Sequence, residues 1–121
     1  MRRFLTTALA ALALIVVLSA CTPAQMRLFG AMTAQHRGVL SSGQLAALRQ
    51  CESSGNYRAH GTYHGAYQFS QSTWNSTAAR HYGFLQGRDP HTVEPWWQDA
   101  MARALWADTG GSAWPHCRRV V

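Results

Sequence analysis

An apolar run near the N-terminus limits what this chain of 121 residues can fold into. Residues 4–18 consist almost entirely of Ala, Leu, Ile and Val, and the basic pair Arg2 and Arg3 precedes them. The run is shorter than the roughly 20 residues that a membrane-spanning helix needs, but it has the length of the apolar region of a signal peptide. We therefore expect residues 1–20 to be an export signal, which leaves room for one small domain only.

The residues that follow this run suggest a lipid anchor. Leu18, Ser19 and Ala20 lead directly into Cys21. This order resembles the lipobox of bacterial lipoproteins, in which the Cys thiol is diacylated and the leader is cut just before it. The alternative is an ordinary secretory signal with a Cys at this position by chance. The resemblance implies a protein that lipid on Cys21 holds at the outer face of the cell membrane, facing the cell wall.

The two remaining cysteines, Cys51 and Cys117, predict a disulfide. An even number of thiols in an exported chain is typical of bridged cysteines. In the chain-entropy model, a bridge over a loop of this length stabilises the fold by roughly 4 kcal/mol. Such a bridge matters because a domain of this size has a small core. The rival interpretation makes Cys51 a thiol nucleophile, which requires a reduced thiol with a histidine held beside it.

The charge of the chain is positive but does not by itself identify a partner. The formal net charge is +6, and every basic residue is an arginine. A positive surface suits a polyanion, either a nucleic acid or an anionic cell wall. The arginines are scattered rather than arranged in a stripe, and no nucleic-acid motif is present. We therefore expect no nucleic-acid partner.

Three helices are predicted after residue 40. Ser41 and Gln44 have the spacing of a capping box, which predicts a helix over about residues 44–53 that Gly55 ends. Ser70 is suited to cap a second helix of about residues 71–81. Pro95 suits the first position of a third helix, which has an apolar face and ends at the pair 110–111.

The segments outside these helices carry weaker signals. Residues 56–69 are rich in Gly, Tyr and His and are expected to form a loop or a short hairpin. Residues 21–40 are expected to be the lipidated Cys and a tether, although an apolar patch there also permits a helical turn. The patch contains Met26, Leu28, Phe29 and Met32. The fold class is therefore mainly α, with a small non-helical or hairpin insert and one disulfide, and the domain spans residues 41–121.

Of the five carboxylates, Glu52 has no obvious structural task. Asp89 precedes a proline in a turn, Glu94 precedes the third helix, and Asp99 and Asp108 fall on or near that helix. Glu52 lies near the last turn of the first helix, where the negative end of the helix dipole disfavours its charged form. This effect raises the pKa, as a general acid requires.

Four ordered blocks of sequence carry a family resemblance. They are CESSGNY at 51–57, YHGAYQF at 63–69, STW at 72–74 and AWPHC at 113–117. Together they resemble the catalytic domain of resuscitation-promoting factors, which are lysozyme-like wall enzymes related to the soluble lytic transglycosylases. The resemblance covers about residues 44–117 and implies a lysozyme-like α+β fold.

The resemblance also implies roles for particular residues. Glu52 corresponds to the single catalytic Glu of the family, and Cys51 and Cys117 to its disulfide. Four residues correspond to positions that line the sugar groove or lie over it: Tyr63, Gln68, Thr73 and Trp74. For Trp74 and Tyr67, core packing is an equally good interpretation. The chain departs from the family at Gly111, where a Trp is frequent, at Tyr67, where a smaller residue is usual, and in a slightly shorter loop between residues 56 and 65.

The reaction that this resemblance implies needs only one carboxylate. Glycosidases commonly use two, but no second acid here has a convincing position. In lytic transglycosylases one Glu protonates the β-1,4 oxygen between MurNAc and GlcNAc and then accepts the proton of the C6 hydroxyl, which attacks C1 and leaves a 1,6-anhydro end. The sequence therefore predicts a monomeric enzyme acting on peptidoglycan glycan strands without a cofactor. The alternatives are a hydrolytic muramidase and a non-catalytic peptidoglycan-binding or signalling lipoprotein.

A metal site is not expected from the sequence. His60 and His64 are four residues apart in a loop, but no third ligand stands at a recognisable spacing and no H-E-x-x-H pattern is present. His81, His91 and His116 are expected to be surface or packing residues.

Overall fold

The computed structural model describes residues 21–121, which are mainly helical. Their α-helices are α1 (Pro23–Thr33), α2 (Ser42–Ser53), α3 (Gln71–His81) and α4 (Pro95–Thr109). Short 3-10 helices, η1 (Ala34–His36), η2 (Gly83–Leu85), η3 (Pro90–Thr92) and η4 (Cys117–Val120), complete the helical structure. The export signal expected at residues 1–20 lies outside the described residues. No helix between residues 21 and 121 is both long enough and apolar enough to cross a membrane.

The capping box predicted before α2 is present. The Ser41 hydroxyl accepts a hydrogen bond from the Gln44 backbone N–H at 3.1 Å, and the Gln44 side chain accepts one from the Ser41 N–H at 2.9 Å. These bonds satisfy two N–H groups that have no partner within the helix. Leu45 and Leu48 then point into the core, and the helix ends where Ser54 takes a left-handed conformation with φ 57°.

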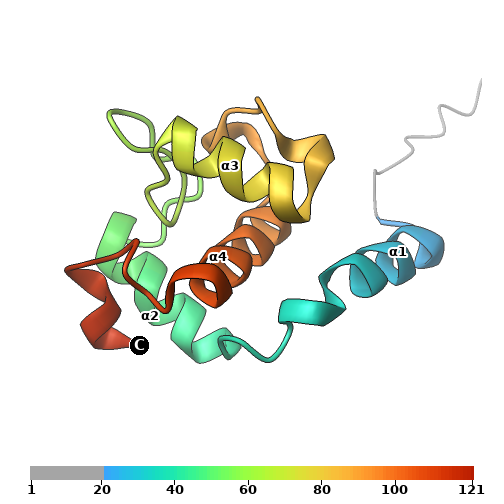
Figure 1. Ribbon diagram of the computed structural model, residues 1–121, viewed down its shortest axis with the longest axis horizontal. Helices are drawn as coiled ribbons and strands as arrows, with labels where there is room; N and C mark the ends of the chain where they lie inside the picture. Colours follow the sequence, from blue (N-terminus) through green and yellow to red (C-terminus); the bar gives the residue numbers. More distant parts are fainter. Residues whose placement is uncertain (1–20) are drawn as a thin grey trace, which may run out of the picture.

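Helices α3 and α4 also begin at the predicted signals. The Ser70 hydroxyl accepts a hydrogen bond of 3.2 Å from the Thr73 N–H, and Pro95 occupies the first turn of α4. Gly110, with φ 60°, ends α4 in the left-handed conformation that glycine adopts without strain. The apolar face of α4 is buried at Met101 and Leu105. Side chains from α2, α3 and α4 form one hydrophobic core, and α4 packs against α3 (Figure 1).

The predicted disulfide is also present. Cys51 on α2 and Cys117 at the start of η4 are bonded, with Cα atoms 5.8 Å apart and a sequence separation of 66. The C-terminal segment consequently lies beside α2, as the red and green ribbons of Figure 1 show. The mainly α class with one disulfide, as expected from the sequence, is confirmed.

The non-helical insert between α2 and α3 is a tight hairpin. His64 and Phe69 form a single antiparallel bridge, with N–H···O distances of 2.9 and 3.0 Å. The Trp114 indole N–H donates to the Tyr67 carbonyl at 2.8 Å, and this bond ties the hairpin to the C-terminal segment. The insert is thus attached to the region of the fold that follows α4.

The segment before α2 is more regular than expected. We favoured a tether for residues 21–40, but residues 23–33 form α1, so the helical alternative is correct there. The signal is a second capping box, in which Thr22 and Gln25 bond each other's backbone N–H, followed by Pro23 in the first turn. In Figure 1, α1 (blue) extends away from the body formed by the other helices. The Phe29 ring contacts the Trp97 ring edge-on, with centroids 4.9 Å apart.

Candidate active site

Glu52 lies in the last turn of α2, directly after the bridged Cys51. The next residue, Ser53, donates a hydrogen bond of 2.7 Å from its hydroxyl to the Ala66 carbonyl in the hairpin. The disulfide attaches the same turn to η4. The neighbours of Glu52 therefore fix its backbone on two sides, while its own side chain is only half-buried.

The electrostatic setting of Glu52 favours its protonated form. Burial raises the pKa of the Glu52 carboxyl above the ordinary 4.5, and the charge of His116 opposes that shift. The negative end of the α2 dipole acts in the same direction as burial. Among residues 21–121, no side chain forms a hydrogen bond or ion pair with this carboxylate. A half-buried carboxyl with a raised pKa and no bound partner is suited to general acid–base catalysis.

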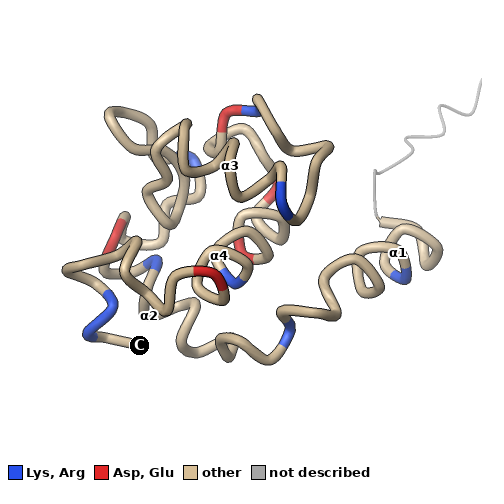
Figure 2. The backbone as a smooth tube through the Cα atoms, in the orientation of Figure 1, with Lys and Arg blue, Asp and Glu red and all other residues tan. Residues whose placement is uncertain are grey.

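The other four carboxylates are all engaged by neighbouring side chains. Their positions are dispersed along the tube in Figure 2 rather than gathered into one acidic site. The closest contacts are Asp89 to His91 at 2.6 Å, Asp99 to Tyr67 at 2.5 Å, Asp108 to His81 at 2.9 Å and Glu94 to Arg88 at 3.9 Å. Glu52 is thus the carboxylate that the structure leaves available.

Asp99 shows how firmly one of these acids is held. It accepts a hydrogen bond of 2.8 Å from the Tyr57 hydroxyl in addition to that from Tyr67, and Arg49 lies 3.9 Å away. Burial, followed by the bond to Asp99, raises the pKa of Tyr57 to about 12 and also raises that of Tyr67. Both hydroxyls therefore remain donors at neutral pH. Asp99 serves as their acceptor and connects α4 to the loop after α2 and to the hairpin.

A small pocket of about 120 Å³ lies between the hairpin, the start of α3 and the C-terminal segment. Three of the predicted groove residues, Tyr63, Gln68 and Thr73, line it. Gln68 has a positive φ of 54°, and its side-chain amide donates to the Gly65 carbonyl at 2.9 Å. Tyr63 is 52% exposed and leaves most of its ring free for contact. The pocket thus combines an aromatic ring, an amide and a hydroxyl, which are groups that contact sugars.

Residues 41–117 match the family described as transglycosylase-like domain. The chain belongs to this transglycosylase-like family. The probable transglycosylases SceD 1 and SceD 3 of Staphylococcus saprophyticus are each 41% identical to it over 73 residues, or 58% of this chain. The chain spans 29% of the length of these curated relatives. No solved structure matches it.

Within this transglycosylase-like domain, Trp74 does not line the pocket. Its side chain is completely buried, and its indole N–H donates to the Leu85 carbonyl at 2.9 Å. The Phe69 ring packs edge-on against it with centroids 5.1 Å apart. The indole therefore has no exposed surface with which to contact a sugar in this structure, which speaks against the predicted substrate contact of Trp74. Burial favours core packing, the equal alternative, for Trp74 and for Tyr67, although Tyr67 also borders the pocket.

Sequence reasoning missed Gln98 as a structural residue of the site. This buried side chain accepts a hydrogen bond from the Ala66 N–H at 2.9 Å and donates to the carbonyls of Tyr57 and Val93 at 3.0 and 2.9 Å. It thus joins the loop after α2, the hairpin and the segment before α4. No local pattern marks it, because a glutamine on an amphipathic helix usually faces solvent.

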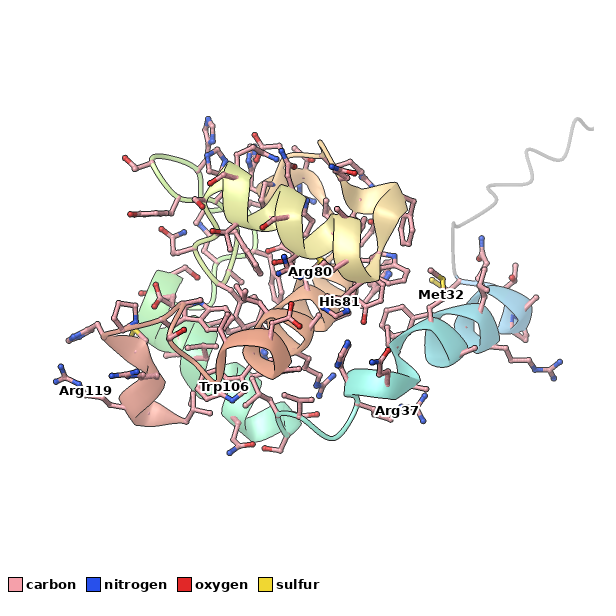
Figure 3. The ribbon with its side chains drawn as sticks, viewed as in Figure 1. Met32, Arg37, Arg80, His81, Trp106 and Arg119 are labelled. Atoms are coloured by element: carbon pink, nitrogen blue, oxygen red, sulfur yellow. A yellow bond between two sulfur atoms is a disulfide. The ribbon has the colours of Figure 1, made fainter. Side chains whose placement is uncertain are left out.

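The glycine at 111, where the family often has Trp, follows from the backbone of this transglycosylase-like domain. Gly111 has φ 89°, and a Cβ there would lie 2.6 Å from the Trp106 ring. Trp106, which extends from α4 in Figure 3, stacks on Trp114 with ring centroids 5.8 Å apart. The Trp106 ring therefore occupies the space next to Gly111. Where the family often has a Trp side chain at this position, the Trp106 ring from α4 fills the space instead.

The fold also brings together histidines that the sequence separates. His60 and His64 of the loop meet Asp89 and His91 from the segment around η3, with potential ligand atoms all within 4.8 Å of one another. The absence of a third ligand at a recognisable spacing was the argument against a metal site. Asp89 and His91 lie 25 or more positions further along the chain, so no local motif could include them.

Proposed function

We propose that this chain cleaves the β-1,4 bond between MurNAc and GlcNAc in peptidoglycan, with Glu52 as general acid and then general base. The observation that carries the proposal is the state of Glu52, a half-buried carboxyl with a raised pKa and no bound partner. Its sequence neighbours attach it to the hairpin and the C-terminal segment, which both border the pocket. Within the transglycosylase-like family, the four motif blocks favour the resuscitation-promoting factor branch.

In the first step of this mechanism Glu52 donates its proton to the glycosidic oxygen. The raised pKa keeps a useful fraction of the carboxyl protonated at a pH where an ordinary glutamate is ionised. Glu52, now a carboxylate, accepts the proton of the MurNAc C6 hydroxyl as that oxygen attacks C1. The bond to GlcNAc breaks, a 1,6-anhydro ring forms, and Glu52 ends in its starting protonation state.

Anhydro-ring formation is preferred to hydrolysis because the chain offers no second free carboxylate. A base or nucleophile on the opposite face of the sugar is needed for the two-carboxylate mechanisms. Asp89, Asp99, Asp108 and Glu94 are each engaged by a histidine, tyrosine or arginine. A substrate hydroxyl as nucleophile removes the need for such a group. Gln68, Thr73 and Tyr63 would hold the glycan against the pocket.

We also propose that lipid on Cys21 attaches the protein to the membrane. The exposed Cys21 borders an apolar groove of about 680 Å³, formed by α1 together with residues before and within α4. Met26 and Leu28 on α1 and Phe84 and Trp96 on the facing side are between 43% and 62% exposed. An apolar surface of this kind next to an acylation site suits contact with the acyl chains of a bilayer.

The test is digestion of purified sacculi with the oxidised chain, followed by mass spectrometry of the products. We expect anhydro-muropeptides from the wild type and none from Glu52→Gln. Glu94→Gln is the matched control, since Glu94 is an exposed glutamate that does not line the pocket, and its replacement should leave turnover intact. Reducing MurNAc ends would identify a hydrolase instead. Sacculi that remain intact but retain the protein would contradict the enzymatic proposal and favour the binding alternative.

A further inference from the structure

Three histidines and an aspartate form a compact cluster that does not include Glu52. His60 and His64 belong to the insert between α2 and α3, whereas Asp89 directly precedes η3 and His91 lies within it. The Nδ1 atoms of His64 and His91 lie 2.8 and 2.6 Å from the same Asp89 oxygen, and 3.3 Å from each other. The His60 ring stacks at a tilt on His91 with centroids 4.3 Å apart.

The backbone around this cluster is fixed by the fold rather than by the cluster itself. The bridge to Phe69 anchors His64, and the next residue is a buried glycine with φ 78°. A Cβ on Gly65 would lie 3.6 Å from the Pro90 backbone and 2.5 Å from the Gln98 side chain. The hairpin thus approaches η3 closely because residue 65 has no side chain. Gln98 then bonds the hairpin and the η3 segment at once.

The spacing of the ligand atoms fits a tetrahedral ion. With zinc-to-ligand bonds of about 2.0 Å, neighbouring ligand atoms in a tetrahedron are about 3.3 Å apart. The distances among the His64, Asp89 and His91 atoms, 2.6, 2.8 and 3.3 Å, are at or below that value. With His60 included, all four ligand atoms lie within 4.8 Å of one another, so an ion would draw the His60 ring inward and spread the other three atoms. Without an ion, only hydrogen bonds hold the His64 Nδ1, the His91 Nδ1 and the Asp89 oxygen together. An ion at the centre would satisfy all of them at once.

We propose that His60, His64, Asp89 and His91 bind one Zn²⁺ ion. Imidazole and carboxylate ligands suit zinc, whereas Mg²⁺ and Ca²⁺ prefer sites built from oxygen alone. The cluster contains a single carboxylate oxygen donor, Asp89, which excludes a high-coordination calcium site. The Nδ1 of both His64 and His91 faces the centre, and the exposed His60 completes the set from the loop.

The ion would act as a clamp between two parts of the chain that Gln98 also joins. On one side is the loop that ends in Tyr63 and His64, and on the other is η3. Tyr63 lines the pocket, so an ion bound by its neighbours on both sides would restrict the position of its ring. With four protein ligands the site is of the closed, structural type. The inference is independent of the reaction proposed for Glu52.

Zinc binding is tested on the full oxidised chain carrying Cys21→Ser, so that no free thiol contributes a ligand. We expect isothermal titration of the chelator-treated protein with ZnCl2 to give one equivalent of binding, and Mg²⁺ to give none. Co²⁺ should produce the intense visible absorption of a tetrahedral site. Hydrogen exchange at residues 58–64 should slow, and the melting temperature should rise with zinc concentration.

His60→Gln is the decisive variant because His60 is exposed and forms no hydrogen bond in the described structure, so its replacement should leave the fold intact. It should weaken zinc binding by about tenfold or more, and Asp89→Asn should do the same. His116→Gln, a histidine variant outside the cluster, should bind as the wild type does. The proposal is overturned if no saturable zinc binding is found. It is also overturned if His60→Gln and Asp89→Asn both retain the wild-type affinity, or if His81→Gln is the variant that abolishes binding.

Discussion

The Ser53 hydroxyl donates to the Ala66 carbonyl at 2.7 Å, so the end of α2 is joined directly to the hairpin. Ala66 is completely buried, and its carbonyl has no exposure to water that would replace this bond. Its N–H is already taken by Gln98. The peptide at Ala66 therefore connects the turn that carries Glu52 with α4. The distance between Glu52 and the pocket residue Gln68 depends on this connection.

Ser53→Ala should therefore lower both stability and turnover. The loss of one partner from a buried carbonyl costs about 1–3 kcal/mol. We expect a lower midpoint in denaturant unfolding. We also expect the rate of sacculus digestion to fall by more than the decrease in the folded fraction accounts for. Ser76→Ala, an exposed serine on α3, is the matched control and should change neither. An unchanged rate in folded Ser53→Ala would show that the bond does not position Glu52.

The raised pKa of Glu52 has a consequence for stability as well as for catalysis. A carboxyl whose pKa is higher in the folded than in the unfolded state contributes stability below the unfolded value and loses it as pH rises through the folded value. Glutamine does not ionise, so Glu52→Gln does not lose this stability as pH rises. Its melting temperature should thus exceed that of the wild type at pH 7, and the difference should shrink as pH falls toward 4.5.

Thermal unfolding from pH 4 to pH 8 checks this expectation, with Glu94→Gln as the control for charge removal at an exposed site. A difference between wild type and Glu52→Gln that stays constant across the range would mean that burial does not shift this carboxyl. The rate of sacculus cleavage should fall at alkaline pH as the acid form of Glu52 is lost.

Gln98 should be among the most sensitive positions in the fold. Gln98→Met keeps a similar volume but removes all three hydrogen bonds to backbone groups. Since unsatisfied buried groups cost about 1–3 kcal/mol each, we expect a loss of roughly 3 kcal/mol or more in the free energy of unfolding. Gln50→Met, at an exposed position of α2, provides the matched comparison. Equal unfolding midpoints for the two variants would refute the role assigned to Gln98.

The contact between η1 and α3 should respond to pH. His36 is buried, and its Nε2 lies 3.2 Å from the Nδ1 of His81, which Figure 3 labels near the end of α3. The Nε2 of His81 contacts Asp108. Burial, and then the charge of His81, lower the pKa of His36 below 6.5, although Asp108 opposes this. The stability that depends on neutral His36 is therefore complete above pH 6.5 and is lost as pH falls through the lower folded value.

Hydrogen exchange at α1 and η1 should accordingly accelerate below pH 6.5 relative to α4, after correction for the intrinsic rate. In His36→Leu this extra acceleration should be absent, because the titrating group has been removed. Arg80, which also binds Asp108, remains charged throughout the range and does not contribute to the change. If the wild type and His36→Leu showed the same pH dependence of hydrogen exchange, a group other than His36 would cause the acceleration.

The sequence predicted those parts of the fold that local chemistry determines. Ser41, Ser70 and Pro95 start helices through bonds within one turn, so their neighbours in sequence suffice to identify them. The pairing of Cys51 with Cys117 followed from the count of thiols once Cys21 was set aside. The capping box at Thr22 and Gln25 has the same spacing as that at Ser41, but we did not identify it from the sequence.

The parts that could not be predicted depend on contacts between distant segments. Trp74 resembled a groove residue by its motif, but its burial follows from packing against Phe69 and from the Leu85 carbonyl. Gln98 and the histidine cluster acquire their partners only when the hairpin folds against η3. For Glu52, sequence provided a position and a resemblance, and the structure adds that its carboxylate is unbound. Its catalytic role remains a prediction for the experiments above.

The bridge between Cys51 and Cys117 has a consequence for when the protein becomes active. Thiols stay reduced in the cytosol and oxidise after export, so a chain that follows the proposed route matures only outside the cell. Cys51 is exposed and accessible to an oxidoreductase, whereas Cys117 is buried once paired. Glu52 follows Cys51 directly, so the chain acquires a fixed acid and a closed fold in one covalent event. Under the proposed function, oxidation times the appearance of glycan cleavage to the compartment that contains the wall.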